Sequence, residues 1–337
     1  MTPFKIGIMG TGRMAGIMSE TLRGMAALGE VELYAVASRT QERADEFAAQ
    51  WGYTRAYGSY EAMVQDPEVQ LVYVATPHSH HYQHARLAVE AGRAVLCEKA
   101  FCANARQARA LIELARERRV FLAEAMWIRY KPFVLALPSL LGRIGRPQLL
   151  ACSLCYPKWF RPTIVRADLC GGALMDLGVY LLHFARICFG SDIDRVVSHC
   201  MKSPETGLDS QDAISLYYRD GRMANMQCSV MCANDRQGIL SGTEGYIVVD
   251  NINNPSRADI YNKEHQLLET LTAPAEITGY EYEVRAAIDA IRQGLLETPL
   301  MPHQETLEIM EQMDAIRQEW GVSFPFDLSE GFEVLRL

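Results

Sequence analysis

The first 28 residues constrain the fold more than any other stretch of the chain. Residues 4–9 form a short apolar run, residues 10–15 read G-T-G-R-M-A, and residues 16–28 have helical spacing of their apolar side chains. A strand, a glycine-containing turn and a helix in this order are typical of the opening of a dinucleotide-binding βαβ unit. Gly10 would permit the tight turn, and Gly12 would let the backbone approach a pyrophosphate at the helix N-terminus. The alternative is an ordinary strand-to-helix turn that contains small residues.

Strand-like and helix-like segments alternate from the N-terminus to about residue 124. The strand-like segments are continuous apolar runs, as expected for parallel strands that are buried on both faces. The pattern predicts an α/β fold with a doubly wound parallel sheet. The expected strands are residues 4–9, 31–38, 70–75, 94–97 and 120–123, and the expected helices between them are residues 16–28, 41–50, 82–91 and 105–118.

The pattern changes after residue 124. Residues 144–157 resemble a longer strand, residues 174–189 a helix, and residues 192–260 a series of strands with turns between them. Two further helices are expected at residues 280–294 and 303–320. Strands in series with flanking helices predict an α+β domain with a mostly antiparallel sheet. We therefore expect two domains, 1–124 and 125–337.

Composition limits the classes of partner. The net charge is −8, and the sequence contains no basic stripe that would neutralise nucleic-acid phosphates, so we expect no nucleic-acid partner. No apolar run approaches the ~20 residues of a membrane span, and the first strand begins too early for a signal peptide. We expect no membrane partner.

The nine cysteines are scattered along the chain. The single C-x-x-C pair, Cys152 and Cys155, has no second pair and no histidine nearby, and in a strand the two side chains would point to opposite faces. Buried free thiols in a reducing cytosol explain the cysteines better than a metal site. We expect a cytoplasmic protein without a bound metal.

The end of the second expected strand bears on the choice of nucleotide. An NAD-binding turn usually has an acidic residue here, which holds the ribose 2′-OH. This chain has Ser38 and Arg39 instead, and an arginine can pair with a 2′-phosphate through two hydrogen bonds. The pattern favours NADP, and NAD stays possible. Arg13 in the glycine turn would add positive charge, or it is a solvated side chain, and Arg39 is alternatively a surface residue at the start of the next helix.

Two strand ends carry polar residues that suit catalysis. The stretch from Thr76 and Pro77 to His81 follows one strand, and Glu98 and Lys99 follow the next. Ligands of doubly wound folds bind beyond the carboxyl ends of the strands. A lysine beside a nicotinamide can act on a substrate hydroxyl through its charge or as a proton donor. The alternative for Lys99 is a loop lysine that pairs with Glu98.

A third polar set lies on the helix expected at residues 174–189. Asp176 and Tyr180 are four residues apart, so they share a helix face, and His183 continues that face. A tyrosine here can exchange a proton with a hydroxyl while hydride moves, provided that a cation such as Lys99 assists it. The alternatives are a packed interface tyrosine for Tyr180 and, which we favour, a structural role for His183.

Taken together, these motifs resemble the glucose–fructose oxidoreductase / inositol dehydrogenase (Gfo/Idh/MocA) family over essentially the whole chain. The resemblance rests on residues 10–15, 75–81, 97–101 and 171–180. Residues 124–130 and 316–327, with Tyr180, are similar to the branch of dimeric dihydrodiol dehydrogenases and NADP-dependent D-xylose dehydrogenases.

The resemblance implies a Rossmann domain and an α/β domain for substrate binding and oligomerisation, whose large open sheet often forms a dimer face. It also implies a catalytic Lys99 in a Glu-Lys-Pro motif, an acid and a tyrosine at Asp176 and Tyr180, and His81 close to the cofactor. Ala100 stands where the family usually has proline. A cis bond before alanine costs roughly 2.5–4 kcal/mol, so the loop at Lys99 is where this chain departs from the family pattern.

We therefore expect an NADP-preferring oxidoreductase that moves a hydride between nicotinamide and a hydroxyl or carbonyl carbon of a sugar, polyol or cyclic diol. The alternatives are an NAD-dependent glycoside hydrolase on the same fold and a non-catalytic nucleotide- or sugar-sensing regulator. A homodimer or homotetramer is expected. The expected catalytic residues are Lys99, Tyr180 and Asp176, and the expected pocket wall contains Trp127, Arg129 and Trp159. The expected cofactor-binding residues are Gly10, Thr11, Gly12, Arg13, Met14, Ser38, Arg39, Thr76, Pro77, His81, Glu98 and Lys99.

Overall fold

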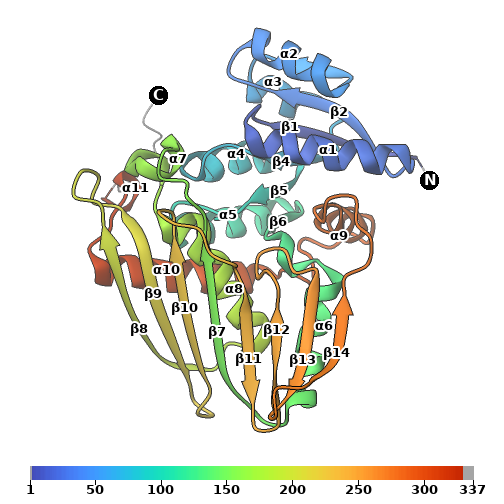
Figure 1. The fold of residues 1–337 in the computed structure, drawn as a ribbon. Helices are drawn as coiled ribbons and strands as arrows, with labels where there is room; N and C mark the ends of the chain where they lie inside the picture. The colour runs from blue at the N-terminus through green and yellow to red at the C-terminus, as the bar shows by residue number, and fades with distance from the viewer. Residues whose placement is uncertain (1, 329–337) are drawn as a thin grey trace. The chain divides into compact units, whose positions relative to one another are not determined.

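The computed structural model describes residues 2–328, which form two compact units (Figure 1). Among these residues, the first unit contains residues 2–130, 276–311 and 326–328, and the second contains Lys131–Ala275 and Gln312–Pro325. The compact units thus alternate along the chain, whereas the domains predicted at 1–124 and 125–337 are consecutive. That division stays a prediction, and residues 329–337 of the second predicted domain lie outside the described residues.

The first unit is built on a six-stranded sheet with the order β3-β2-β1-β4-β5-β6. All of its strand pairs are parallel, and the strands near the centre are buried along nearly their whole length. This confirms the predicted doubly wound sheet, and its connections reverse direction between β1 and β4. The strands are β1 (Phe4–Met9), β2 (Val31–Ala37), β3 (Arg55–Tyr57), β4 (Leu71–Val74), β5 (Ala94–Glu98) and β6 (Leu122–Ala125).

The helices of the first unit follow the predicted alternation with two notable differences. The short strand β3 and the short helix α3 (Tyr60–Gln65), which lie between β2 and β4, were not predicted. The helix predicted from residue 82 begins four residues earlier, at His78, with Pro77 as its N-cap. Its first turn contains Ser79 and His81, whose polar side chains are buried, so the turn lacks the apolar spacing that marks a helix in sequence. The connecting helices are α1 (Arg13–Ala27), α2 (Gln41–Trp51), α3 (Tyr60–Gln65), α4 (His78–Glu90) and α5 (Ala105–Arg118).

Helix α9 (Glu281–Arg292) belongs to the core of the first unit, although it is distant in sequence. Its apolar face, including Val284, Ala287 and Ile288, joins the cluster of buried side chains around β1. Burial of this face against the parallel sheet is the main favourable contribution of α9 to the fold.

The second unit is built on an eight-stranded sheet with the order β14-β13-β12-β11-β7-β10-β9-β8. Only the β7–β10 pair is parallel, so the predicted large, mostly antiparallel sheet is confirmed. The strands are β7 (Pro147–Cys155), β8 (Ile193–Lys202), β9 (Asp209–Tyr218), β10 (Met223–Ser229), β11 (Gly238–Gly242), β12 (Gly245–Val249), β13 (Arg257–Asn262) and β14 (Leu267–Thr272).

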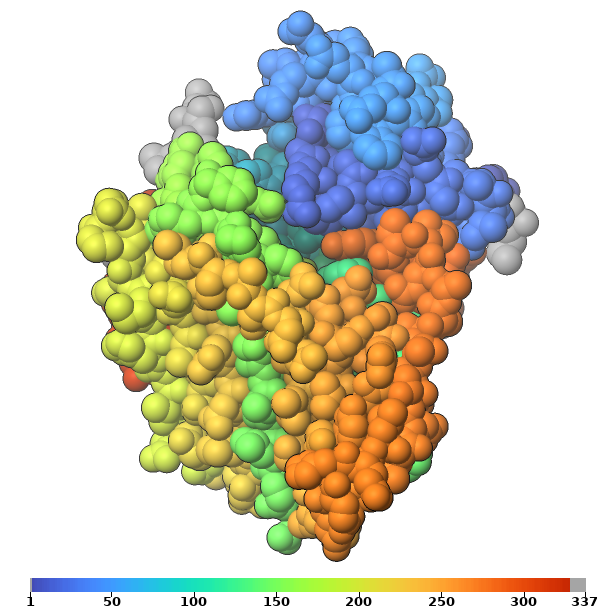
Figure 2. All heavy atoms as spheres, in the orientation of Figure 1, coloured from blue at the N-terminus to red at the C-terminus, as the bar shows by residue number. Residues whose placement is uncertain are grey.

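One face of this sheet is covered and the other is open. Helix α8 (Val179–Phe189) packs on β7 and β10, and nearly all of its side chains are buried. The opposite face presents the strands without a covering helix (Figure 2). Apolar side chains on it are exposed, including Val197 at 47% and Met201 at 58%. The remaining helices in and after this unit are α6 (Pro132–Leu140), α7 (Pro162–Val165), α10 (His303–Trp320) and α11 (Pro325–Leu328).

Within residues 2–328, one segment, Ala167–Phe189, is long and apolar enough to cross a membrane. Of its apolar window, 83% is buried inside the chain, which is the pattern of a core helix. The same residues contain no group of three or more His, Cys, Asp or Glu side chains placed to hold a metal ion.

Candidate active site

The glycine turn between β1 and α1 has the geometry that a pyrophosphate site needs. Gly10 has a φ of +106°, and a Cβ there would approach the Ala75 carbonyl oxygen to 2.9 Å, so a side chain is excluded. A Cβ on Gly12 would meet nothing within 4 Å. Gly12 also caps α1 without a side-chain hydrogen bond, and the first turn contains no acid. The residues present therefore fit an anionic group at this helix N-terminus.

The end of β2 has no carboxylate and two nearby arginines. The Ser38 hydroxyl is buried and lies 3.3 Å from the Thr11 hydroxyl, which connects this strand end to the glycine turn. Arg39 and Arg43 are exposed. Burial raises the pKa of Tyr60, and the charges of Arg39 and Arg43 lower it, so the positive charge of both arginines acts at that phenol. Arg43 was not among the predicted residues, because it lies in the first turn of α2 and no motif contains it.

His81 connects the ends of β4 and β5. Its ring nitrogens lie 2.8 Å from the carbonyl oxygen of Thr76 and 2.8 Å from that of Ala100, and the side chain is 1% exposed. Burial lowers the pKa of His81 to about 3, whereas the two carbonyl oxygens act to raise this pKa. His81 therefore contacts the backbone of both loops that were predicted to surround a cofactor.

The loop after β5 presents Lys99 at the carboxyl end of the sheet. Glu98, the last residue of β5, is buried and accepts hydrogen bonds from the Tyr73 hydroxyl and from the Lys99 backbone N–H, the latter at 3.2 Å. The Lys99–Ala100 peptide bond is cis. The loop thus adopts a cis bond although alanine replaces the proline of the family pattern.

Two further carboxyl groups lie behind this loop. Glu124, in register with Cys97 on the neighbouring strand, is 2% exposed, and Glu283 on α9 is fully buried. Burial, with a smaller contribution from the charge of Glu98, raises the pKa of Glu124 to about 8. Burial and then the charge of Glu98 raise the pKa of Glu283 well above its ordinary range. Both carboxyl groups therefore stay neutral over a wider pH range than an exposed glutamate does.

The predicted pocket-wall residues of the first unit have partners within that unit. The Trp127 ring stacks on Tyr280 with centroids 4.2 Å apart and an interplanar angle of 4°. Arg129 forms a 2.8 Å ion pair with Glu305, and both side chains are largely buried. Trp159, in the second unit, is half-buried.

The segment that carries Asp176 in the second unit begins as a π-helix. Residues Leu174–Gly178 are π-helical and continue directly into α8, whereas an α-helix was predicted over 174–189. Its start is held by the buried Asp209, whose carboxylate accepts the Leu174 N–H at 2.6 Å. Gly172 has a φ of +108°, and a Cβ there would lie 2.3 Å from Asp209 Oδ1. Single π turns within helices frequently occur at functional sites.

Asp176 forms an ion pair that the sequence did not reveal. Lys158 Nζ lies 2.9 Å from Asp176 Oδ2, and each side chain is 17% exposed. The two residues are 18 positions apart and lie on different segments, so no local spacing connects them. Tyr180 follows on α8 with 7% of its surface exposed, and His183 is fully buried, as a structural histidine would be.

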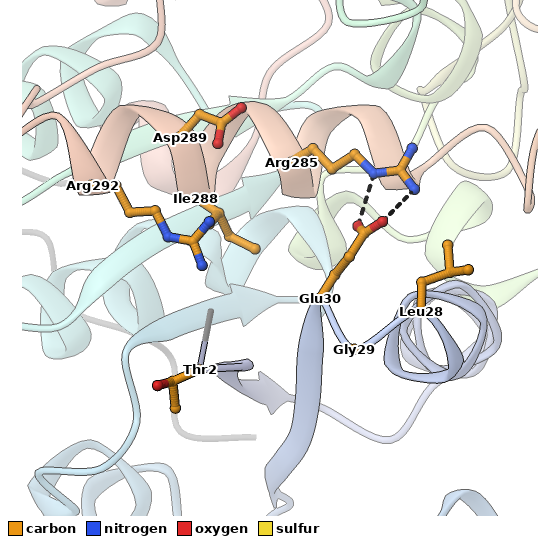
Figure 3. A pocket seen from close by; sticks show the side chains of 8 residues that line it. All are labelled: Thr2, Leu28, Gly29, Glu30, Arg285, Ile288, Asp289 and Arg292. Carbon is orange, nitrogen blue, oxygen red and sulfur yellow. Dashed lines mark hydrogen bonds and ion pairs between the residues drawn. The ribbon is translucent and has the colours of Figure 1, made fainter.

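A hollow of about 390 Å³ in the first unit lies away from these residues (Figure 3). It is found at the amino ends of β1 and β2, whereas the glycine turn and Lys99 follow carboxyl ends. Arg285 reaches into it from α9 and pairs with Glu30 at 2.8 and 2.9 Å. Ligands of doubly wound sheets bind at the carboxyl ends, so this hollow is not the cofactor site. It is lined by Thr2, Leu28, Gly29, Glu30, Arg285, Ile288, Asp289 and Arg292.

The parallel sheet, the glycine turn and the lysine after β5 define an NAD(P)-binding oxidoreductase, and the comparisons with known proteins agree. Residues 4–126 match the oxidoreductase family with an NAD-binding Rossmann fold, and residues 141–248 match the GFO/IDH/MocA C-terminal domain. The chain belongs to the Gfo/Idh/MocA family, which confirms the resemblance seen in its motifs.

Relatives include trans-1,2-dihydrobenzene-1,2-diol dehydrogenases. The mouse protein is 30% identical over 333 residues, which is 95% of this chain and 98% of the relative. The rabbit protein is 32% identical over 331 residues, with coverage of 95% and 99%.

Among solved structures, a 3-ketoreductase from Actinomadura kijaniata in complex with NADP and TDP-benzene is similar. It superposes with a TM-score of 0.85 at 25% identity, covering 96% of this chain and 100% of that one. A levoglucosan dehydrogenase in complex with NADH and L-sorbose shares the fold, with a TM-score of 0.84 at 17% identity and coverage of 95% and 97%.

Proposed function

We propose that this chain is an NADP-preferring dehydrogenase or reductase acting on a hydroxyl or carbonyl carbon of a sugar, polyol or cyclic diol. The observation that carries the proposal is the retention of acid–base groups in an oxidoreductase of this family: Lys99 directly after β5, and Asp176 and Tyr180 on one continuous helix. A non-catalytic sensor would need none of these three side chains.

In the proposed reaction, each of these three side chains has a distinct role. Tyr180 accepts the proton of the reacting hydroxyl, and the positive charge of Lys99 stabilises the phenolate that forms. Asp176 accepts a hydrogen bond from a neighbouring hydroxyl and thereby orients the substrate. The nicotinamide supplies or accepts the hydride when it is bound. In the reverse direction, Tyr180 returns the proton to the carbonyl oxygen.

The cofactor would be held by the first unit. The backbone of Gly10, Thr11 and Gly12 and the first turn of α1, with Arg13 and Met14, would bind the pyrophosphate. His81 would fix the loops that contain Thr76, Pro77, Glu98 and Lys99.

The preference for NADP rests on the end of β2. Ser38 and Arg39 stand where an NAD site usually has an acid, and Arg43 adds a second guanidinium group near Tyr60. A 2′-phosphate placed there would meet positive charge and no carboxylate.

The proposed substrate class follows the relatives. One is a dehydrogenase of a cyclic diol and another was crystallised with L-sorbose, and both ligands carry adjacent hydroxyl groups.

We also propose a homodimer or homotetramer, because the open face of the eight-stranded sheet exposes apolar side chains such as Val197 and Met201. Light scattering on the purified protein reads the oligomeric state directly.

The test of the proposed function is absorbance at the reduced-nicotinamide band. Purified protein is mixed with NADP or NAD and a panel of pentoses, hexoses, inositols and trans-dihydrodiols. Reduction of NADP with one substrate group is the expected result. A silent panel, despite measurable binding of the cofactor, contradicts the proposal.

A further inference from the structure

The Lys158–Asp176 ion pair lies one turn before Tyr180 on the helix that carries Asp176. It is a built feature of the second unit, because the backbone around Lys158 is fixed. Its N–H donates to the Val230 carbonyl at 2.8 Å, and its own carbonyl accepts the Arg161 N–H at 2.9 Å. The connection after β7 is thereby held to the segment after β10.

The aromatic ring of Tyr156 limits where the Lys158 ammonium can move. Lys158 Nζ lies 4.7 Å from the centroid of this ring, and the Arg236 guanidinium lies 5.0 Å from it. The Tyr156 hydroxyl accepts from Arg236 at 2.9 Å and lies 3.2 Å from Asn253 Oδ1. The ring is thus held by two partners and forms a rigid support for the ammonium group.

An ion pair in this position is a poor stabilising device, because each partner loses solvation when it is partly buried. It is a good positioning device for two reasons. A carboxylate one turn before Tyr180 would oppose the negative charge that forms on the phenol, and the ammonium of Lys158 offsets it. The ammonium also holds the carboxylate in one rotamer, so that its lone pairs point in fixed directions.

We propose that Lys158 is a positioning and specificity-determining residue of the proposed reaction. Its ammonium group offsets the negative charge of Asp176 and holds this carboxylate in one rotamer, so that Asp176 accepts a hydrogen bond from a hydroxyl adjacent to the reacting carbon. The site therefore selects vicinal diols over mono-alcohols. This inference rests on the proposed function, in which Asp176 orients the substrate.

The experiment compares substrates that differ in one adjacent hydroxyl. The two pairs are trans-1,2-cyclohexanediol with cyclohexanol, and D-glucose with 2-deoxy-D-glucose. The ratio of kcat/KM within each pair is measured with NADP for the wild type, Lys158→Met and Lys158→Arg. A site built to bind a hydroxyl rejects the analogue that lacks it, because a buried polar group is then left without a partner.

In the wild type we expect the diol or sugar to be favoured by at least about 100-fold. In Lys158→Met the ratio should fall at least tenfold, and Lys158→Arg should retain most of it. Lys263→Met removes a lysine from an exposed ion pair in the same unit and is the matched control, with no change in ratio. Far-UV circular dichroism establishes that each variant is folded.

Calorimetric titration of the same pairs in the presence of NADP separates the two proposals. If Lys158→Met turns over substrate with an unchanged ratio of kcat/KM within each pair, the proposed role of Lys158 is wrong and the proposed function is unaffected. Binding that discriminates between the pair and depends on Lys158, without any turnover, supports the role of Lys158 and overturns the proposed function. An equal fall in kcat/KM for both substrates of a pair in Lys158→Met means that Lys158 has a merely structural role, and this contradicts the inference.

Discussion

The buried Glu124 makes the stability of the chain depend on pH in a defined direction. Its pKa is raised from its usual 4.5 to about 8, chiefly by burial. Between these two values the folded chain holds a proton that the unfolded chain has released. The free energy of unfolding therefore falls as the pH rises through this window. At 1.36 kcal/mol per pH unit, the complete effect is on the order of 5 kcal/mol.

The Glu124→Gln variant removes this titration while it keeps the shape of the side chain. The amide does not titrate, and it replaces a carboxyl group whose Oε2 already lacks a hydrogen-bond partner, so the energetic cost of the substitution itself does not change with pH. The informative quantity is therefore the slope. The stability of Glu124→Gln relative to the wild type should increase by about 1.4 kcal/mol per unit between about pH 5 and pH 7.5.

Urea melts at several pH values, followed by intrinsic fluorescence, measure this difference. Glu117→Gln is the control, because Glu117 lies on the exposed face of α5 and its substitution removes a carboxylate without affecting the interior. A difference in stability between wild type and Glu124→Gln that stays constant from pH 5 to pH 7.5 would mean that Glu124 is ionised in the folded chain, which contradicts this prediction.

Two further predictions concern the cofactor turn and the helix that carries Asp176. Arg39→Asp should raise the KM for NADP by about 10- to 100-fold and lower the KM for NAD, because hydrogen bonds to charged groups contribute about 1.5–3 kcal/mol. Steady-state kinetics with both cofactors measure the two KM values, and an unchanged ratio between them contradicts the prediction. Gly172→Ala should lower the free energy of unfolding by at least about 1–3 kcal/mol, since it places a Cβ at positive φ and against Asp209; a melting temperature equal to that of the wild type contradicts it.

The parallel sheet of the first unit could be predicted because its strands are buried on both faces and therefore appear as continuous apolar runs. The glycine turn could be predicted because a φ of +106° at Gly10 and the close approach to Ala75 leave room for no other residue type. Tertiary constraints of this kind act on consecutive residues and so leave a readable pattern in the local sequence, and these patterns predicted the correct fold class.

Other features depend on contacts between distant segments. The Lys158–Asp176 ion pair joins the connection after β7 to a π-helical turn, and nothing in the spacing of the two residues reveals it. The membership of α9 in the first unit depends on its packing against β1. The early start of α4 was missed because His81 and Ser79 are buried through polar contacts rather than apolar ones.

We propose that Lys99 and Tyr180 perform acid–base catalysis during hydride transfer. The most direct test is the turnover number of Lys99→Ala and Tyr180→Phe with NADP and the substrate that the wild type uses best, alongside binding of NADP to each variant. Both variants should bind NADP and lose more than about 100-fold in turnover. Near-normal rates in both variants would contradict it.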